Sequence, residues 1–166
     1  MMAGKTTIAD AANLILDRMG YSVHQLDGDD LRNSYGRKLG YNRTDILHNN
    51  QTVVQLAASA RQISDLVIIT VIGPLNAGRL LARETFASDY AEVHVSAKLH
   101  TLEKRDTKGL YSLATTGEID DLIGVGDGVE YETPEHPDLL IETDLENVND
   151  SVEKFVRFVN RFCNKQ

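Results

Sequence analysis

The stretch Leu66-Val67-Ile68-Ile69-Thr70-Val71-Ile72 is the clearest strand in this sequence of 166 residues. An unbroken run of mostly β-branched apolar residues is typical of a strand that is buried on both faces, as in a parallel sheet. Gly73-Pro74 ends the run. Because parallel strands need crossover connections, usually helices, this stretch predicts an α/β fold.

The segments on either side of this strand alternate between helical and extended patterns. The spacing of apolar residues predicts helices over 5–19, 44–62, 77–87, 99–105 and 150–163, and strands over 21–26, 91–95 and 139–141. Residues 117–137 are rich in Gly, Asp and Glu and are expected to form an ordered loop. This alternation predicts a parallel sheet with right-handed crossovers.

Three residues are candidates for helix ends, since each is of the type preferred there. Gly20 stands where a C-terminal glycine belongs, while Thr44 and Asp150 are candidate N-caps. The expected buried faces of the first, second and last helices are Ile8, Ala11, Ala12, Ile15 and Met19; Val53, Val54, Leu56, Ala57 and Ala60; and Val152, Phe155, Val156, Val159 and Phe162.

Length and composition indicate one ordered domain over residues 1–166, with 42% hydrophobic residues and a formal net charge of −8. The acidic balance excludes broad binding to nucleic acid, which needs a basic face. No apolar run approaches the ~18 residues of a membrane span, and the N-terminus has no apolar signal segment. The single cysteine, Cys163, fits a reducing, cytoplasmic compartment.

Ala3-Gly4-Lys5-Thr6 matches the second half of the phosphate-binding motif G-x-x-x-x-G-K-[ST]. In that motif, glycine lets backbone amides turn toward phosphate oxygens, the lysine reaches the β- and γ-phosphates, and the threonine hydroxyl reaches Mg²⁺. A helix that starts directly afterwards adds its N-terminal dipole. A Gly-Lys-Thr triplet also arises by chance, and half a motif leaves that alternative open.

Asp27-Gly28-Asp29-Asp30, followed by Arg32, stands where a predicted strand ends. Open α/β sheets bind ligands at such ends. Carboxylates there can hold Mg²⁺-bound water or accept a proton from a hydroxyl nucleophile. An ordinary acidic turn is the alternative.

The segment from Arg105 to Tyr111 places two cations, Arg105 and Lys108, beside a glycine. This pattern is compatible with a mobile lid that closes on a phosphate during transfer. Taken alone, it fits better with a solvated helix end, because cations favour the C-terminal dipole.

Together these motifs resemble the adenylyl-sulfate kinase (APS kinase) family, a branch of the P-loop kinases, over essentially the whole chain. The matching segments, in the family's order, are Gly4-Lys5-Thr6-Thr7, Asp27 to Arg32, Leu39-Gly40-Tyr41, Gly73-Pro74, Arg105 to Tyr111, Gly117-Glu118-Ile119 and Tyr131-Glu132. The resemblance implies a P-loop kinase three-layer sandwich with a parallel sheet in the order 2-3-1-4-5. It also implies that homodimers are common among its members.

The activity implied by the resemblance is transfer of a phosphoryl group from ATP, with Mg²⁺, to the 3′-hydroxyl of a small nucleotide-like substrate in sulfate assimilation. The implied ATP and metal contacts come from Gly4, Lys5, Thr6, Thr7 and Arg105, with Thr6 and Asp27 on the Mg²⁺ side. Asp27 is the expected general base or anchor for Mg²⁺-bound water. Lys108 would neutralise charge on the transferred group, and the implied substrate-binding residues are Asp29, Arg32, Asn49, Lys108 and Leu122.

The sequence departs from the family where APS would be recognised. Family arginines are replaced by Ile46, Gln51, Thr52 and Asn76, and Leu122 stands where the family has a phenylalanine that stacks on the base. Each lost hydrogen bond to a charged group is worth roughly 1.5–3 kcal/mol. Two alternatives therefore stay open: a kinase for another nucleotide conjugate, such as a cytidine-diphosphate derivative in surface-polysaccharide modification, and a degenerate, non-catalytic kinase-like protein.

P-loop kinases place a strand directly before the phosphate loop, whereas this sequence begins inside that loop. In the order 2-3-1-4-5 that strand is central, between 66–72 and 91–95. We expect its position to be vacant, or filled by another chain or a rearrangement. Each buried backbone group left unpaired costs roughly 1–3 kcal/mol, which argues against a folded monomer with an empty position. The chain as it stands is expected to bind ATP weakly or not at all.

Overall fold

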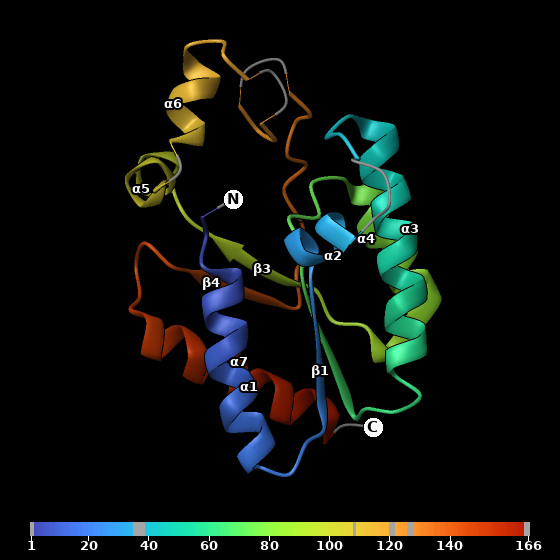
Figure 1. The fold of residues 1–166 in the computed structure, drawn as a ribbon. Coiled ribbons are helices and arrows are strands. Elements are labelled where there is room, and N and C mark those ends of the chain that lie inside the picture. Colours follow the sequence, from blue (N-terminus) through green and yellow to red (C-terminus); the bar gives the residue numbers. More distant parts are fainter. Residues whose placement is uncertain (1, 35–38, 108, 120–121, 126–127, 165–166) are drawn as a thin grey trace.

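The computed structural model describes residues 2–34, 39–107, 109–119, 122–125 and 128–164, which form helices on both sides of short parallel strands (Figure 1). The strands are β1 (Val23–Asp27), β2 (Leu66–Thr70), β3 (Val93–Ser96) and β4 (Leu139–Glu142). The α-helices are α1 (Lys5–Arg18), α2 (Gly28–Ser34), α3 (Arg43–Ala60), α4 (Asn76–Phe86), α5 (Leu99–Arg105), α6 (Leu110–Thr115) and α7 (Val148–Cys163), and a 3₁₀ turn spans Ala87–Asp89.

The strands form two parallel pairs. β1 pairs with β2 from Val23 opposite Leu66 to Asp27 opposite Thr70, and β3 pairs with β4 from Val93 opposite Leu139 to Ser96 opposite Glu142. Among the described residues, β2 and β3 share no ladder. The α/β class and the parallel pairing are therefore confirmed, whereas the order 2-3-1-4-5 stays a prediction.

The main core lies between the strands and the helix pair α1 and α7. Leu16 and Ala12 of α1 and Ile141 of β4 are fully buried, and Phe155 and Val159 of α7 pack against them. α3 and α4 lie on the other side of β1 and β2 (Figure 1). This layering fixes the N-terminus of α1 beside the ends of the strands.

The predicted buried face of α1 was wrong at two positions. Ile15 and Met19 are 39% and 47% exposed, whereas Leu16 is fully buried. The buried stripe follows the contact with α7 and is centred on Ala12 and Leu16. Leu56 of α3 is likewise 38% exposed, while the rest of its predicted face is buried.

Both predicted N-caps were also wrong. α3 begins one residue before Thr44, and the Asn42 side chain accepts from the backbone N–H of Asp45. In α7 the cap is Asn147, which accepts from the backbone N–H of Asp150. Asp150 instead lies in the first turn, where a carboxylate favours the helix dipole.

Two short helices, α2 and α6, were not predicted. They contain 7 and 6 residues, too few for a clear apolar period. The strand predicted over 66–72 ends at Thr70, and Val71 and Ile72 continue as a loop. None of the helices among the described residues is long and apolar enough to cross a membrane.

Candidate active site

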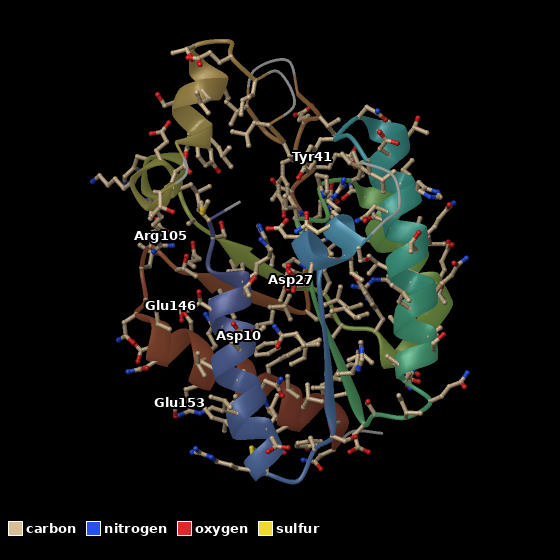
Figure 2. The ribbon with its side chains drawn as sticks, in the orientation of Figure 1. Asp10, Asp27, Tyr41, Arg105, Glu146 and Glu153 are labelled. Carbon is tan, nitrogen blue, oxygen red and sulfur yellow. The ribbon has the colours of Figure 1, made fainter. Side chains whose placement is uncertain are left out.

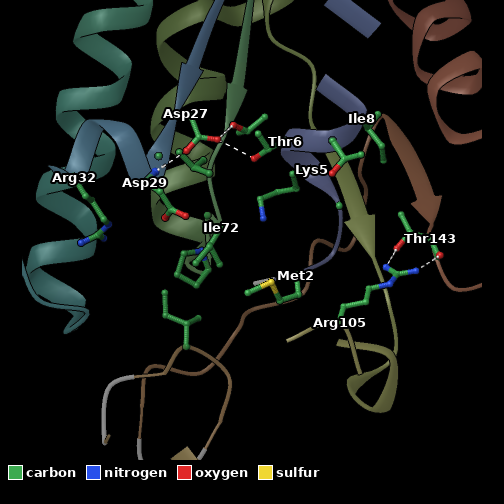
Figure 3. A pocket seen from close by; sticks show the side chains of 18 of the residues that line it. Met2, Lys5, Thr6, Ile8, Asp27, Asp29, Arg32, Ile72, Arg105 and Thr143 are labelled. Carbon is green, nitrogen blue, oxygen red and sulfur yellow. Dashed lines mark hydrogen bonds between the residues drawn. The ribbon is translucent and has the colours of Figure 1, made fainter. Parts of the chain in front are cut away.

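A cavity of about 680 Å³ opens where the strands end (Figure 3). Its wall includes Asp27 and Thr70 from the carboxyl ends of β1 and β2, and Thr143, which directly follows β4. The N-terminal turn of α1 forms another side. Ligands bind at this edge in open α/β sheets because loops and helix N-termini converge there.

The turn that opens α1 is shaped to receive an anion. Gly4 has a left-handed φ of 92°, a conformation that other residues adopt at a cost. The first backbone hydrogen bond of the helix runs from the N–H of Ile8 to the carbonyl of Gly4 at 3.0 Å. The N–H groups of the three residues before Ile8 therefore have no partner within the helix. Gly4, Lys5, Thr6 and Thr7 all line the cavity.

Asp27 receives hydrogen bonds on both carboxylate oxygens. Oδ2 accepts from the hydroxyls of Thr6 at 2.9 Å and Thr70 at 2.6 Å, and Oδ1 accepts from the backbone N–H of Asp29 at 2.8 Å (Figure 3). Burial acts to raise the pKa of Asp27, but these hydrogen bonds and one from the Asp30 backbone outweigh it and hold the pKa below its ordinary value. Asp27 is therefore a carboxylate at neutral pH.

Lys5 supplies a cation beside this carboxylate. Its side chain points into the cavity (Figure 3), and burial lowers its pKa, while the charges of Asp29 and Asp27 act in the opposite direction. Lys5, Thr6 and Asp27 thus place a cation, a hydroxyl and a carboxylate at one point, as the sequence motifs predict.

Asp29, Arg32 and Asn49 line another part of the same cavity. The guanidinium of Arg32 lies 4.5 Å from the centre of the Tyr41 ring and donates to the carbonyl of Gly40 at 3.0 Å. Asn49 is only 4% exposed. These residues form a polar wall with an aromatic ring, which suits a flat base and an anionic group.

Arg105 reaches the cavity from the end of α5 (Figure 2). Its two terminal nitrogens donate to the hydroxyl and the carbonyl of Thr143 at 2.8 and 2.7 Å. Thr143 also donates to the carbonyl of Ala3 at 3.0 Å. This network ties the residues after β3 and β4 to the residue just before Gly4.

Two of the predicted site residues are not placed in the cavity. Lys108 lies outside the described residues. Leu122 is 5% exposed and is absent from the described cavity lining, whereas its neighbour Ile123 belongs to that lining. Ile46, which replaces a family arginine, is 1% exposed and gives the cavity an apolar side.

Thr143 and Ser151 line the cavity but were not predicted from the sequence. Ser151 is 1% exposed, and its hydroxyl has no hydrogen-bond partner among the described residues. Thr143 could have been found, because it directly follows the predicted strand over 139–141. Ser151 carries no such signal, since only the packing of α7 against α1 brings it to the cavity.

The oxygen atoms of Thr6 and Asp27 fit a hard cation such as Mg²⁺. Because the Thr6 hydroxyl donates its proton to Asp27, its lone pairs remain for another partner. The described residues contain no cluster of three or more His, Cys, Asp or Glu side chains that could hold a metal by itself. Mg²⁺ commonly needs only one or two protein ligands beside substrate phosphates and water.

Known proteins resemble this chain over most of its length. The adenylylsulphate kinase family model matches residues 1–142. An adenylyl-sulfate kinase of Halothermothrix orenii is 38% identical over 157 residues, 95% of this chain and 83% of that protein. One of Paraburkholderia xenovorans is 40% identical over 154 residues, 93% and 85% of the two chains.

A solved structure shares the fold as well. The Mycobacterium tuberculosis APS kinase CysC, in complex with AMPPNP and APS, superposes with a TM-score of 0.88 at 30% identity, over 96% of this chain and 92% of that one. Sequence and fold agree with the geometry of the cavity, and the chain belongs to the adenylyl-sulfate kinase family of phosphotransferases.

Proposed function

We propose that this chain phosphorylates the 3′-hydroxyl of adenylyl sulfate with ATP, giving 3′-phosphoadenylyl sulfate for sulfate assimilation. One observation carries the proposal. A single cavity holds the α1 N-terminus with Lys5 and Thr6, the carboxylate of Asp27, and a polar wall with Arg32. A donor site, a reaction centre and an acceptor site are thereby continuous.

The ATP side is built from main-chain and cationic groups. The N–H groups before Ile8 and the Lys5 ammonium suit the phosphates, because both present positive charge to the same space. Arg105 and Ser151 lie along the same cavity, where the guanidinium and the unpaired hydroxyl suit a purine base. In the similar structure from M. tuberculosis, the bound molecules are AMPPNP and APS.

Mg²⁺ would be held by Thr6 directly and by Asp27 through water, and when bound it neutralises charge on the β- and γ-phosphates. The residues themselves position the reactants. Asp27 keeps Thr6 oriented through the bond to its hydroxyl and remains ionised at neutral pH. A strong base is unnecessary where the transition state is loose, so a carboxylate of low pKa can accept the hydroxyl proton late in the transfer.

Asp29, Arg32 and Asn49 are proposed to hold the acceptor nucleotide, with Lys108 on the transferred group. The positions at which family arginines are replaced affect which acceptor the cavity binds. Ile46 is an apolar part of the cavity wall, and the side chain of Asn76 accepts a hydrogen bond from Arg79. The relatives from H. orenii and P. xenovorans both carry the adenylyl-sulfate kinase name, so a cytidine-diphosphate acceptor or a non-catalytic role is not favoured.

The test is a product assay with millimolar ATP and Mg²⁺. Formation of 3′-phosphoadenylyl sulfate from APS is expected, and the Lys5→Met variant should lower kcat by about 10²–10³-fold. Faster turnover of a cytidine-diphosphate derivative would favour the altered-acceptor alternative. Absence of turnover on both acceptors would favour the non-catalytic one.

We further propose that the protein is a cytoplasmic enzyme that acts on small nucleotides and forms a homodimer, as the family resemblance implies. Analytical ultracentrifugation of the chain tests the dimer. A species of 36–37 kDa, about twice the 18.4 kDa chain, is expected, and a single species of 18.4 kDa would contradict it.

A further inference from the structure

Arg79 of α4 contacts a part of the active-site wall without being among the described residues that line the cavity. Gly73 and Pro74, which follow β2, belong to that lining. One terminal nitrogen of the guanidinium donates to the carbonyl of Gly73. The other donates to the carbonyl of Glu132 at 2.5 Å and to the side chain of Asn76. One side chain therefore joins residues 73–76, which we call the wall segment, to the chain around Glu132.

Glu132 adds two hydrogen bonds of its own to the wall segment. Its backbone N–H donates to the carbonyl of Pro74 at 2.8 Å, and its carboxylate accepts from the backbone N–H of Asn76 at 2.5 Å. Because Arg79 binds both the wall segment and the carbonyl of Glu132, these contacts form a closed ring. The wall segment is thereby held through main-chain atoms, which a change of side chain on the segment would not remove.

The guanidinium of Arg79 is largely buried and is fixed by an ion pair. Its side chain is 12% exposed, and its Nε lies 3.1 Å from Oε1 of Glu92, whose side chain is 14% exposed. This carboxylate and the oxygens of Gly73, Asn76 and Glu132 thus surround the N–H groups of one guanidinium. With its donors directed to the protein in this way, Arg79 is suited to hold the wall segment and not to bind an anionic substrate itself.

The wall segment belongs to the side of the cavity where the acceptor is proposed to bind. Leu75 is 1% exposed and forms a buried cluster with Ile46, against which Tyr41 packs. Ile72, directly before the wall segment, packs against the same cluster and lines the cavity (Figure 3). Tyr41 is the ring that the guanidinium of Arg32 covers. A shift of the wall segment would therefore disturb the proposed acceptor residues first.

We propose that Arg79 is a positioning residue, which fixes the wall segment and thereby sets the affinity of the cavity for the acceptor nucleotide. This inference rests on the proposed function, because that function places the acceptor on this side. Arginine suits the role because its planar fork can bridge two main-chain carbonyls while it pairs with Glu92, whereas lysine carries a single ammonium group. Small displacements matter at such a wall, since a misplacement of about 1 Å can cost about 100-fold in rate.

The test compares Arg79→Lys with Arg83→Lys in the kinase assay. Arg83 lies one turn further along α4 and pairs with Asp138 at 3.1 Å and with the same Glu92 at 3.7 Å, and none of its described hydrogen bonds or ion pairs reaches the wall segment. Both substitutions keep the positive charge and remove one guanidinium from the same helix. Arg79→Lys should raise the KM for APS about tenfold or more and leave the KM for ATP within about twofold. Arg83→Lys should leave both within about twofold.

A merely structural role would lower the amount of folded enzyme without changing one KM alone. An unchanged KM for APS in Arg79→Lys, or an equal rise in both KM values, would therefore overturn the inference. Circular dichroism checks that each variant folds. The double variant Arg79→Gln with Glu92→Gln removes both charges of the buried pair, so it leaves no unpaired charge if the single variant is unstable. It should show the same selective rise in the KM for APS.

Amide hydrogen exchange at Glu132 separates this inference from the proposed function, because it needs no substrate. The N–H of Glu132 is bonded to the carbonyl of Pro74, so its exchange reports whether the wall segment stays in place. It should exchange about tenfold faster or more in Arg79→Lys and at the wild-type rate in Arg83→Lys. Unchanged exchange in Arg79→Lys would overturn the positioning role. Wild type that forms no product from APS would contradict the proposed function, and the exchange rates would then decide the positioning role alone.

Discussion

At the scale of single residues, Asp27 links the phosphate-binding turn of α1 to the polar residues at the ends of the strands. It fixes the Thr6 hydroxyl and accepts from Thr70, so one carboxylate connects α1 to the ends of both β1 and β2. The hydrogen bonds that lower its pKa also contribute stability. Its contribution to stability can therefore be measured through its pH dependence.

Replacement Asp27→Asn should lower the free energy of unfolding by roughly 1–3 kcal/mol at pH 7, because an amide nitrogen cannot accept from two hydroxyls. The folded pKa lies below its ordinary value of 3.8, so the contribution is complete above that value and is lost as the pH falls through the folded pKa. The difference between wild type and variant should be constant from pH 7 to 5 and shrink below about pH 4.

Urea unfolding at several pH values measures this difference. Asp30→Asn is the control, since its exposed side chain should cost no more than about 0.5 kcal/mol. A difference for Asp27→Asn that does not change between pH 7 and pH 3 would contradict the role given to its hydrogen bonds.

Arg105 is proposed to contact ATP rather than the acceptor. Arg105→Ala should raise the KM for ATP about tenfold, which corresponds to about 1.4 kcal/mol, and should leave the KM for APS within about twofold. Lys104→Ala, on the same helix and exposed, controls for the loss of a cation. Equal effects of the two variants on the KM for ATP would indicate a general charge effect.

At the scale of elements, α1 carries the phosphate-binding turn at one end and an ordinary helix end at the other. Gly4 and Gly20 have nearly the same left-handed φ, 92° and 95°, and neither would bring an added Cβ within 3.8 Å of another atom. Strain is therefore the common cost of a substitution at either position. Only Gly4 lines the cavity.

Gly4→Ala and Gly20→Ala should each lower the free energy of unfolding by about 1–2 kcal/mol, the cost of the left-handed conformation. Only Gly4→Ala should also weaken ATP binding beyond this effect, because it alters the turn that presents the amides. Thermal unfolding and nucleotide titration of both variants test this pair. Equal loss of ATP affinity in both would show that the turn has no special part in binding.

Much of the element pattern could be predicted because it depends on local periodicity. The run from Leu66 to Ile72 and the helix after Gly4 are examples, and Gly20 has the left-handed φ expected at a helix end. The N-caps were missed because Asn42 and Asn147 stand before the apolar period begins. The burial of Leu16 in place of Ile15 depends on the angle at which α7 crosses, which one helix does not encode.

The candidate site likewise contains residues that could be predicted from local sequence and residues that could not. Lys5, Thr6, Asp27 and Asp29 could be predicted because each adjoins a strand end or a helix start, where local sequence already suggests ligand binding. Ser151 could not, because a helix far along the chain brings it there. Ile123, rather than the predicted Leu122, lines the cavity, since a one-residue difference in a loop is set by packing.

At the scale of the whole molecule, the fold consists of two parallel strand pairs between helix layers, with one cavity at the strand ends and a second cavity of about 610 Å³ between the pairs. Among the described residues, β2 and β3 share no ladder. Ala3 lines the second cavity, and its neighbour Gly4 lines the cavity at the strand ends. The two cavities are therefore adjacent.

We propose that the residues of this cavity transfer a phosphoryl group from ATP to APS. The most direct test is to incubate the chain with ATP labelled in its γ-phosphate, Mg²⁺ and APS, and to separate the nucleotides by chromatography. We predict label in 3′-phosphoadenylyl sulfate, dependent on both substrates and lowered about 10²–10³-fold by Lys5→Met. Label that appears only in inorganic phosphate, or product formation that is equal in the Lys5→Met variant, would contradict the claim.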